Sequence, residues 1–267
     1  MTSLKSFQLD KAVFNPALYS RIYKAWFGGL PDGASSAPDE LSKRWFGFGA
    51  TDEEKKALDD EFKREFEGAL DAIGPSKLTL PTFVDLESDR KQYEDFAKPF
   101  TSEFKTLETS DNEAARAGPE VALVLIILLD QISRNVFRTE QARIFNHYDR
   151  ISQAILHVVR QQKLDRHKMF DLQPPKWLWF YMPLMHSESI EDHETLVQIL
   201  TELKAGLVGE EYKDGAQYVD RGIYFSGLHR AILEKFGRYP HRNRFLGRLT
   251  TEEEQAWLDA GGERFGT

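Results

Sequence analysis

The chain has 267 residues, of which 41% are hydrophobic and 29% charged, a composition typical of a folded globular protein. Its formal net charge of −8 argues against a general nucleic-acid-binding protein, because phosphate binding needs a basic surface. The absence of cysteine excludes disulfides, thiolate metal sites and cysteine nucleophiles.

Neither a secretory signal nor a membrane span is evident in the sequence. The opening residues, MTSLKSFQLDK, lack the apolar core of a signal peptide. The longest purely apolar run, Val121 to Leu129, is far shorter than the roughly 20 residues that cross a bilayer. We therefore expect a soluble, cytoplasmic protein with no membrane partner.

Helix start and stop signals are clear near the beginning of the chain. Asn15 before Pro16 predicts an N-cap with proline in the first turn, and this helix should end at Gly28. Thr51 followed by Glu54 is a capping box, and apolar residues then recur at helical spacing. Two amphipathic helices are expected here.

Residues 75–118 are less regular and mix proline, threonine and charged residues. We interpret them as a longer, partly helical excursion across the surface, with a short helix near residues 89–98. Gly118 and Pro119 then open the most apolar helix, which runs to Leu129. A helix without a polar face is expected to be central and buried.

The rest of the chain shows further helical periodicity. Caps and apolar spacing predict helices over residues 151–159, 174–181, 189–207, 216–236 and 251–261. No strand pattern of comparable strength and no clear internal repeat appear. We predict one all-α domain over residues 1–267, built from antiparallel helix pairs.

The first polar run that could carry chemistry is LLDQISRNVFR, at the end of the most apolar helix. Asp130 and Arg134 are four residues apart, as are Gln131 and Asn135, so each pair can meet on one helix face. A bidentate contact from Asp130 would orient the guanidinium and leave donors for a ligand. The alternative is a structural polar cluster at a buried helix end.

A second polar run, FGRYPHRN, places Arg238, His241, Arg242 and Asn243 in a loop constrained by a glycine and a proline. Loops on a rigid helical scaffold often carry binding groups. Alternatively, the two arginines bond the carbonyl groups at the ends of neighbouring helices.

A third group follows the aromatic helix, where His186 and Glu188 could form an acid–base pair. Alternatively, Glu188 only precedes the helix cap Ser189, and His186 is a core histidine. His229 and Arg230 add another polar point, unless both are partly exposed helix residues.

The sequence gives no support for a metal or a nucleotide cofactor. His186, Glu188, Asp192 and His193 are possible metal ligands, but they lack the HExxH spacing or a comparable one. No glycine-rich phosphate loop, dinucleotide fingerprint or GxSxG elbow is present. We expect neither a metal nor a cofactor.

A resemblance to a known family rests on three stretches: LLDQISRN at 128–135, FYMPLMHSES at 180–189 and HRAILEKFGRYPHRNRFLGR at 229–248. Together with the aromatic pair at 26–27 and the triplet at 44–46, they resemble the family catalogued as domain of unknown function 924. The resemblance implies a right-handed, tetratricopeptide-like helical fold and no established activity. Ile132 and Ser133 stand where that family typically has an aromatic residue and a proline.

Three functions are compatible with these residues. In the first, Arg134, Arg238 and Arg242 grip the carboxylate or phosphate of a small molecule, and His186 or His241 exchanges a proton, which would make the protein a metal-independent acid–base enzyme. The second is a helical scaffold for a protein or peptide partner.

The third function, RNA binding, rests on residues 221–250, where seven basic residues against Glu234 alone give a net charge of +6. The overall acidity makes nucleic acid the least favoured partner. The small-molecule pocket is the preferred prediction.

Overall fold

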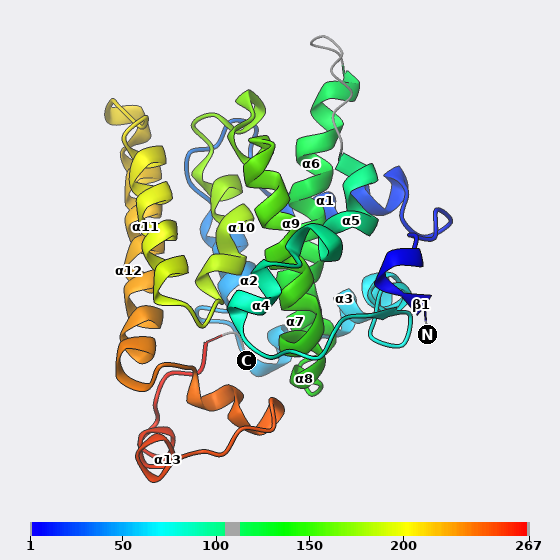
Figure 1. Ribbon diagram of the computed structural model, residues 1–267. Coiled ribbons are helices and arrows are strands. Elements are labelled where there is room, and N and C mark those ends of the chain that lie inside the picture. Colours follow the sequence, from blue (N-terminus) through cyan, green and yellow to red (C-terminus); the bar gives the residue numbers. More distant parts are fainter. Residues whose placement is uncertain (1, 105–112, 266–267) are drawn as a thin grey trace.

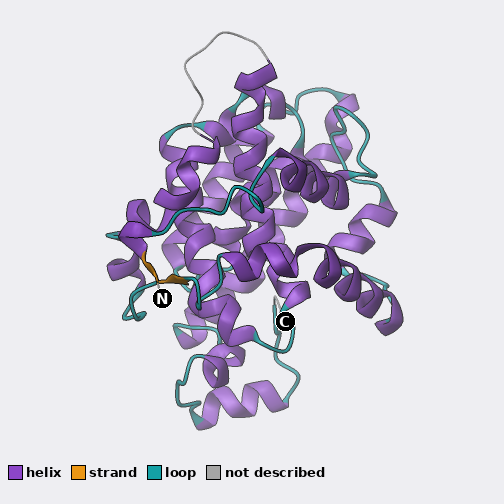
Figure 2. Ribbon diagram, turned by 90° about the vertical axis from the view of Figure 1, so that its right-hand side faces the viewer, coloured by secondary structure: helices purple, strands orange, loops and turns teal. Residues whose placement is uncertain are grey.

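The computed structural model describes residues 2–104 and 113–265, and in this part of the chain the predicted all-α fold is confirmed (Figures 1 and 2). Its α-helices are α1 (Pro16–Phe27), α2 (Asp39–Phe46), α3 (Asp52–Ala72), α4 (Leu86–Arg90), α5 (Tyr93–Phe104), α6 (Glu113–Ile127), α7 (Ser133–Val136), α8 (Gln141–Arg143), α9 (Asp149–Gln161), α10 (Pro174–Met185), α11 (Ile190–Lys204), α12 (Lys213–Phe236) and α13 (Glu252–Asp259).

Shorter elements connect these helices. Two are π-helical turns, η2 (Leu128–Ile132) and η3 (Ile144–Tyr148). The 3₁₀ turns are η1 (Leu4–Ser6), η4 (Leu164–Arg166), η5 (Lys168–Phe170), η6 (Glu210–Tyr212) and η7 (Pro240–Phe245). Two-residue strands, β1 (Thr2–Ser3) and β2 (Leu78–Thr79), pair in parallel.

The predicted helix ends agree with the capping chemistry. The side chain of Asn15 accepts hydrogen bonds from two backbone N–H groups at the start of α1. Thr51 and Glu54 form the complete capping box of α3. Gly237 ends α12 in the left-handed conformation, with φ of 70°, which glycine adopts without a steric penalty.

The most apolar helix is the centre of the fold, as predicted. Every side chain from Ala122 to Leu129 is fully buried. Figure 1 shows α6 and α9 in the middle, α10 to α12 on one side, and α1 and α5 on the other. Helix α10 packs against α6, α9, α11 and α12, so its aromatic residues link the two sides of the core.

The expected surface excursion is only partly correct. Helix α5 is not superficial, because Tyr93, Phe96, Phe100 and Phe104 are buried and the helix packs along α9. These four residues recur at helical spacing, a signal masked by the flanking prolines and charges. Part of the predicted segment, residues 105–112, lies outside the described residues.

The chain after α12 forms a small appendage. Tyr239, Ile232 and Leu233 make a second apolar cluster, against which Trp257 and Phe265 pack. Beyond α13 the chain turns back towards the helical body, where its end is marked in Figure 1. There the ring of Phe265 stacks on His229, with centroids 3.8 Å apart.

Helices α11 and α12 lie side by side as one of the predicted helix pairs. The right-handed, tetratricopeptide-like arrangement stays a prediction. None of the helices in residues 2–104 and 113–265 is long and apolar enough to span a membrane.

Candidate functional site

The carboxylate of Asp130 is the centre of a buried polar network. It lies on η2, and Nδ1 of His186, at the end of α10, is 3.0 and 3.1 Å from its two oxygens. The amide of Gln131 also donates to it. Burial raises the pKa of Asp130, but His186, Arg134 and Gln131 together outweigh burial and hold it below its usual value. Asp130 is therefore a buried, ionised carboxylate.

The predicted bidentate pair between Asp130 and Arg134 is wrong. The guanidinium of Arg134 instead binds both oxygens of Asp149, at 2.8 and 3.0 Å, from the start of α9. Its Nη1 donates to the backbone carbonyl of Asp130 and is 3.9 Å from the carboxylate. Because η2 has i→i+5 bonding, the residue four positions on is no longer stacked on Asp130 as in an α-helix.

His186 has one ring nitrogen bound and one directed to a cavity. A carboxylate only accepts hydrogen bonds, so Nδ1 carries the proton that Asp130 receives. Burial, followed by the charge of Arg134, lowers the pKa of His186, so the ring is neutral near pH 7. The side chain lines a cavity, and no described group binds Nε2. Nε2 is thus a free proton acceptor.

Arg242 holds the backbone around His186. Its Nη1 donates to the carbonyl of His186, the C-cap of α10, at 3.0 Å. The guanidinium also lies 4.6 Å from the ring centroids of Phe145 and Tyr239. Burial lowers the pKa of Arg242. This arrangement matches the alternative in which an arginine bonds a helix-end carbonyl.

Glu188 does not pair with His186, which corrects the predicted acid–base pair. Its carboxylate binds Arg248 with contacts of 2.6 and 2.8 Å and accepts the backbone N–H of Tyr239 at 2.8 Å. Two positively charged neighbours are available to Glu188, whereas His186 is neutral, so the ion pair with arginine is favoured.

The remaining residues of the second polar run stabilise the appendage. Arg238 binds the carboxylate of Glu254 through two nitrogens, and the amide of Asn243 donates to the same carboxylate. His241 is buried beside the ring of Tyr239, and burial lowers its pKa to about 3. Neither Arg238, His241, Arg242 nor Asn243 lines the cavity described next.

A cavity of about 670 Å³ lies between α2, α3, α7, α10 and α12. Four of the predicted site residues line it, namely Arg134, Asn135, His186 and His229. Its aromatic wall comes from Trp45, Phe46, Phe48, Phe225 and Phe265. Asn135 does not bind Gln131, as its spacing had suggested, but donates to Asp59 at 2.8 Å. The cavity therefore has one polar end and apolar walls, as small-molecule sites commonly do.

One face of α12 forms a side of this cavity. Tyr218, Gly222, Phe225 and His229 line it at spacings of four, three and four residues. A Cβ on Gly222 would be only 3.3 Å from Leu178, so the glycine allows α10 to approach closely. Arg230, predicted as a site residue beside His229, does not line the cavity and binds Glu234 at 2.7 Å.

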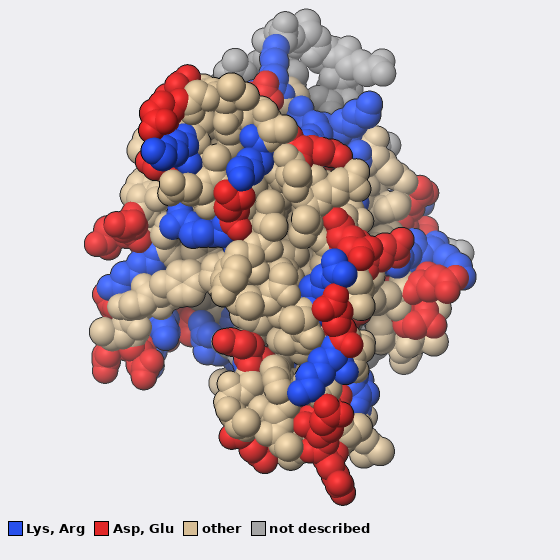
Figure 3. All heavy atoms as spheres, turned by 90° about the vertical axis from the view of Figure 1, so that its left-hand side faces the viewer, with Lys and Arg blue, Asp and Glu red and all other residues tan. Residues whose placement is uncertain are grey.

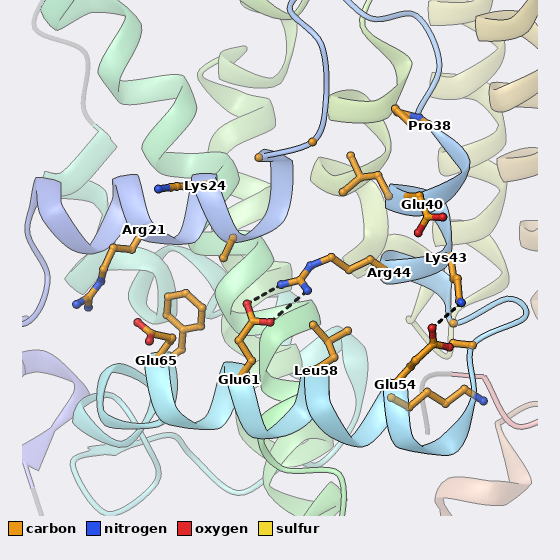
Figure 4. A pocket seen from close by; sticks show the side chains of 18 of the residues that line it. Arg21, Lys24, Pro38, Glu40, Lys43, Arg44, Glu54, Leu58, Glu61 and Glu65 are labelled. Atoms are coloured by element: carbon orange, nitrogen blue, oxygen red, sulfur yellow. Dashed lines mark hydrogen bonds and ion pairs between the residues drawn. The ribbon is translucent and has the colours of Figure 1, made fainter.

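A second hollow of about 870 Å³ lies among α1, α2 and α3 (Figure 4). Two ion pairs span the opening: Arg44 binds Glu61 through two nitrogens, and Lys43 binds Glu54 at 2.7 Å. It contains none of the predicted site residues. Although it is larger, solvated ion pairs of this kind are ordinary surface features.

Within residues 2–104 and 113–265, no group of three or more histidine, aspartate or glutamate side chains is placed to hold a metal ion. The cavity is lined by single imidazoles, by arginines and Lys55, and by one carboxylate, that of Glu263.

Comparison with known proteins places the chain in a family. A family model described as a bacterial protein of unknown function, DUF924, matches residues 22–262. The chain belongs to this family. A solved structure of a protein of unknown function from Agrobacterium tumefaciens is also similar, with 25% identity and a TM-score of 0.55, covering 94% of this chain and 100% of that one. No curated protein matches the chain.

Several residues of the site were missed from the sequence. Asp149 binds Arg134. An aspartate at the start of a helix is common, so its position in the sequence does not show that it pairs with a buried arginine. Helix α2 was not predicted, although its RWF triplet, continued by Phe48, is the aromatic signal that could have indicated a cavity wall. Tyr218, within the predicted helix at 216–236, was not among the predicted site residues.

Proposed function

We propose that the protein is an enzyme that performs acid–base chemistry, without a metal, on a small molecule bearing a carboxylate or phosphate. The observation that carries the proposal is the buried Asp130–His186 pair beside the 670 Å³ cavity. A carboxylate-oriented imidazole facing a partly apolar cavity is a common arrangement for a general base. We place the activity in the cytoplasm on the sequence grounds given above.

The proposed mechanism uses His186 as the proton acceptor. Asp130 fixes the Nδ1–H tautomer, so Nε2 is available to accept a proton from the substrate. The imidazolium that forms is stabilised by the ionised carboxylate behind it. Arg134, neutralised by Asp149, keeps Asp130 ionised without itself drawing a substrate anion to the histidine.

Two other cations are available for the substrate anion. Arg134, Arg44 and Arg138 line the cavity, but each binds a carboxylate of the protein. Lys55 and Arg221 also line it, are exposed, and make no ion pair among the described residues. Two unpaired cations at a cavity mouth attract a small anion. Elsewhere, the face of α11 and α12 mixes both charge signs and attracts no single kind of charge (Figure 3).

An alternative function is supported by two exposed aromatic side chains, of which Phe48 lines the cavity and Tyr224 lies on α12. Phe48 is 59% exposed and Tyr224 is 64% exposed. Exposed aromatic residues on a helical, tetratricopeptide-like scaffold would suit a bound peptide. We rank this second, because a flat binding surface does not need a buried, oriented histidine.

The proposal predicts that anionic metabolites stabilise the protein. A ligand that binds only the folded state adds about 2.7 kcal/mol at a hundredfold excess over its Kd, which a thermal melt detects. Members of an anionic metabolite panel should raise Tm, and proton NMR in D₂O should show their conversion or deuterium exchange. Replacing the base by His186→Gln should slow that reaction by about 100-fold or more.

His157→Gln is the matched control, because His157 lies on α9 away from the cavity and contacts only Gln161 and Tyr93. This variant should react at the wild-type rate. Stabilisation by peptides, with no metabolite effect, would instead favour the scaffold. A ligand that binds but reacts equally fast in His186→Gln would refute the role of the histidine.

A further inference from the structure

The two histidines of the cavity have the same tautomer. Nδ1 of His229 is 2.8 Å from the carbonyl oxygen of Phe225, and a carbonyl only accepts, so this nitrogen carries the proton. Nδ1 of His186 is protonated for the same reason, since it faces the carboxylate of Asp130. In both rings Nε2 is therefore a bare lone pair.

The lone pair of His229 has no partner, although it is buried. Burial lowers the pKa of His229 to about 2, so the ring does not acquire a second proton near neutral pH. The rings of His186 and His229 have centroids 6.4 Å apart and line the same cavity. Nε2 of His229 is covered, and Phe265 stacks on its ring, so a ligand donor reaches this nitrogen when Phe265 moves aside. The two rings then make one end of the cavity a pair of hydrogen-bond acceptors.

An anion is disfavoured at this end. Two acceptor lone pairs repel carboxylate or phosphate oxygens. Of the two guanidinium groups nearby, that of Arg134 is bound to Asp149, and that of Arg242 donates to the carbonyl of His186 and does not line the cavity. A buried acceptor without a partner is unfavourable, so the ligand group that fits here is one that donates.

The free cations lie elsewhere, Arg221 on the same helix and Lys55 on α3. Arg221 precedes His229 by eight residues on α12, which corresponds to about 12 Å along the helix axis. The side chains between them that face the cavity are apolar, chiefly Phe225, with Met182 from α10 opposite. The cavity therefore changes along α12 from cationic, through apolar, to hydrogen-bond accepting.

We propose that the ligand is an elongated amphipathic acid, with its anion at Lys55 and Arg221, an apolar middle, and a neutral hydroxyl or amide N–H donor at His186 and His229. This inference rests on the proposed function, and it places the anion at Lys55 and Arg221 rather than at Arg134, Arg238 and Arg242, where the sequence predicted it. The proton that His186 removes would then come from the donor end of the ligand or from the atom beside it.

The first test measures the tautomers directly on the full-length protein. With ¹⁵N-labelled histidine, NMR should show Nδ1 protonated and Nε2 unprotonated in both His186 and His229 at pH 7. A proton on Nε2 of either ring would overturn the proposal, and this measurement requires neither a ligand nor a variant.

The second test compares three probes of similar length by titration calorimetry. We expect 8-hydroxyoctanoate to bind about tenfold more tightly than octanoate, because only the first offers a donor, and also more tightly than 1,8-octanediol, which lacks the anion. His229→Phe keeps a ring against Phe265 and removes the acceptor. It should abolish the preference for the hydroxy acid while octanoate binding is unchanged.

Equal binding of 8-hydroxyoctanoate and octanoate to the wild type would overturn the inference, as would a diol that binds as tightly as the acids. If none of the three probes binds while another anionic metabolite raises Tm, the proposed function is retained and this ligand class is wrong. If no small molecule binds at all, both proposals fail.

Discussion

Acidification from pH 7 to pH 5 is expected to remove most of the stability of the protein. Burial lowers the pKa of His147 and His193 to about 4, of His241 to about 3 and of His229 to about 2. These rings stay neutral when folded, whereas in the unfolded chain they bind protons below about pH 6.5. Protonation of each of these histidines in the unfolded chain therefore lowers the free energy of unfolding by up to about 2 kcal/mol at pH 5. This is a large share of the roughly 5–15 kcal/mol that stabilises a typical domain.

Asp130 and Glu188 reinforce this trend at lower pH. The folded pKa of each carboxylate is depressed, so it stabilises the fold above its unfolded pKa and loses that effect as the pH falls through the folded one. Urea unfolding followed by tryptophan fluorescence between pH 8 and pH 4.5 measures the slope. A free energy of unfolding that stays constant from pH 7 to pH 5 would contradict the neutral, buried state of the histidines.

Arg134→Ala is expected to be strongly destabilising, by about 3–5 kcal/mol, because it leaves two buried carboxylates without their cation. Only about a tenth of the Arg134 side chain is exposed, and Asp149 loses both of its contacts from this guanidinium. The free energy from urea unfolding at pH 7 measures the effect. The matched control, Arg230→Ala, removes a 40%-exposed arginine in an i,i+4 pair and should change stability by less than about 1 kcal/mol.

A double-mutant cycle separates the ion pair from general damage. If the destabilisation comes from the uncompensated charge of Asp149, then Arg134→Ala combined with Asp149→Asn should cost less than the sum of the two single changes. Additive losses would show that Arg134 acts through packing. An Arg134→Ala protein with wild-type stability would remove Arg134 from the network altogether.

Local signals in the sequence were enough for most of the fold. The caps at Asn15 and Thr51, and the uninterrupted apolar run of α6, each determine a helix through interactions within a few residues. Helix α2 was missed because it has no side-chain cap and only eight residues, so tertiary packing of Trp45 determines it.

The sequence was enough to predict which polar segments contribute to the site, but not which side chains bind one another. Residues at 130, 186 and 242 do lie together, with Arg242 and Asp130 both bound to His186. Their actual partners depend on contacts 15 to 60 residues apart, such as Arg134 with Asp149 and Glu188 with Arg248. Spacing within a helix cannot show such long-range choices, and here a π-helical turn also changed the spacing itself.

That turn also determines how the chain tolerates a change in length. In η2 the backbone accommodates more residues per turn than in an α-helix. Deleting one residue between Leu128 and Ile132 would allow regular α-helical bonding and keep α7 in nearly the same orientation relative to α6, because the π-turn accommodates one extra residue. Deleting one residue within the regular helix α6 would instead rotate everything downstream by about 100° and take Arg134 away from Asp149. A single-residue deletion in η2 should therefore be tolerated better than one in α6.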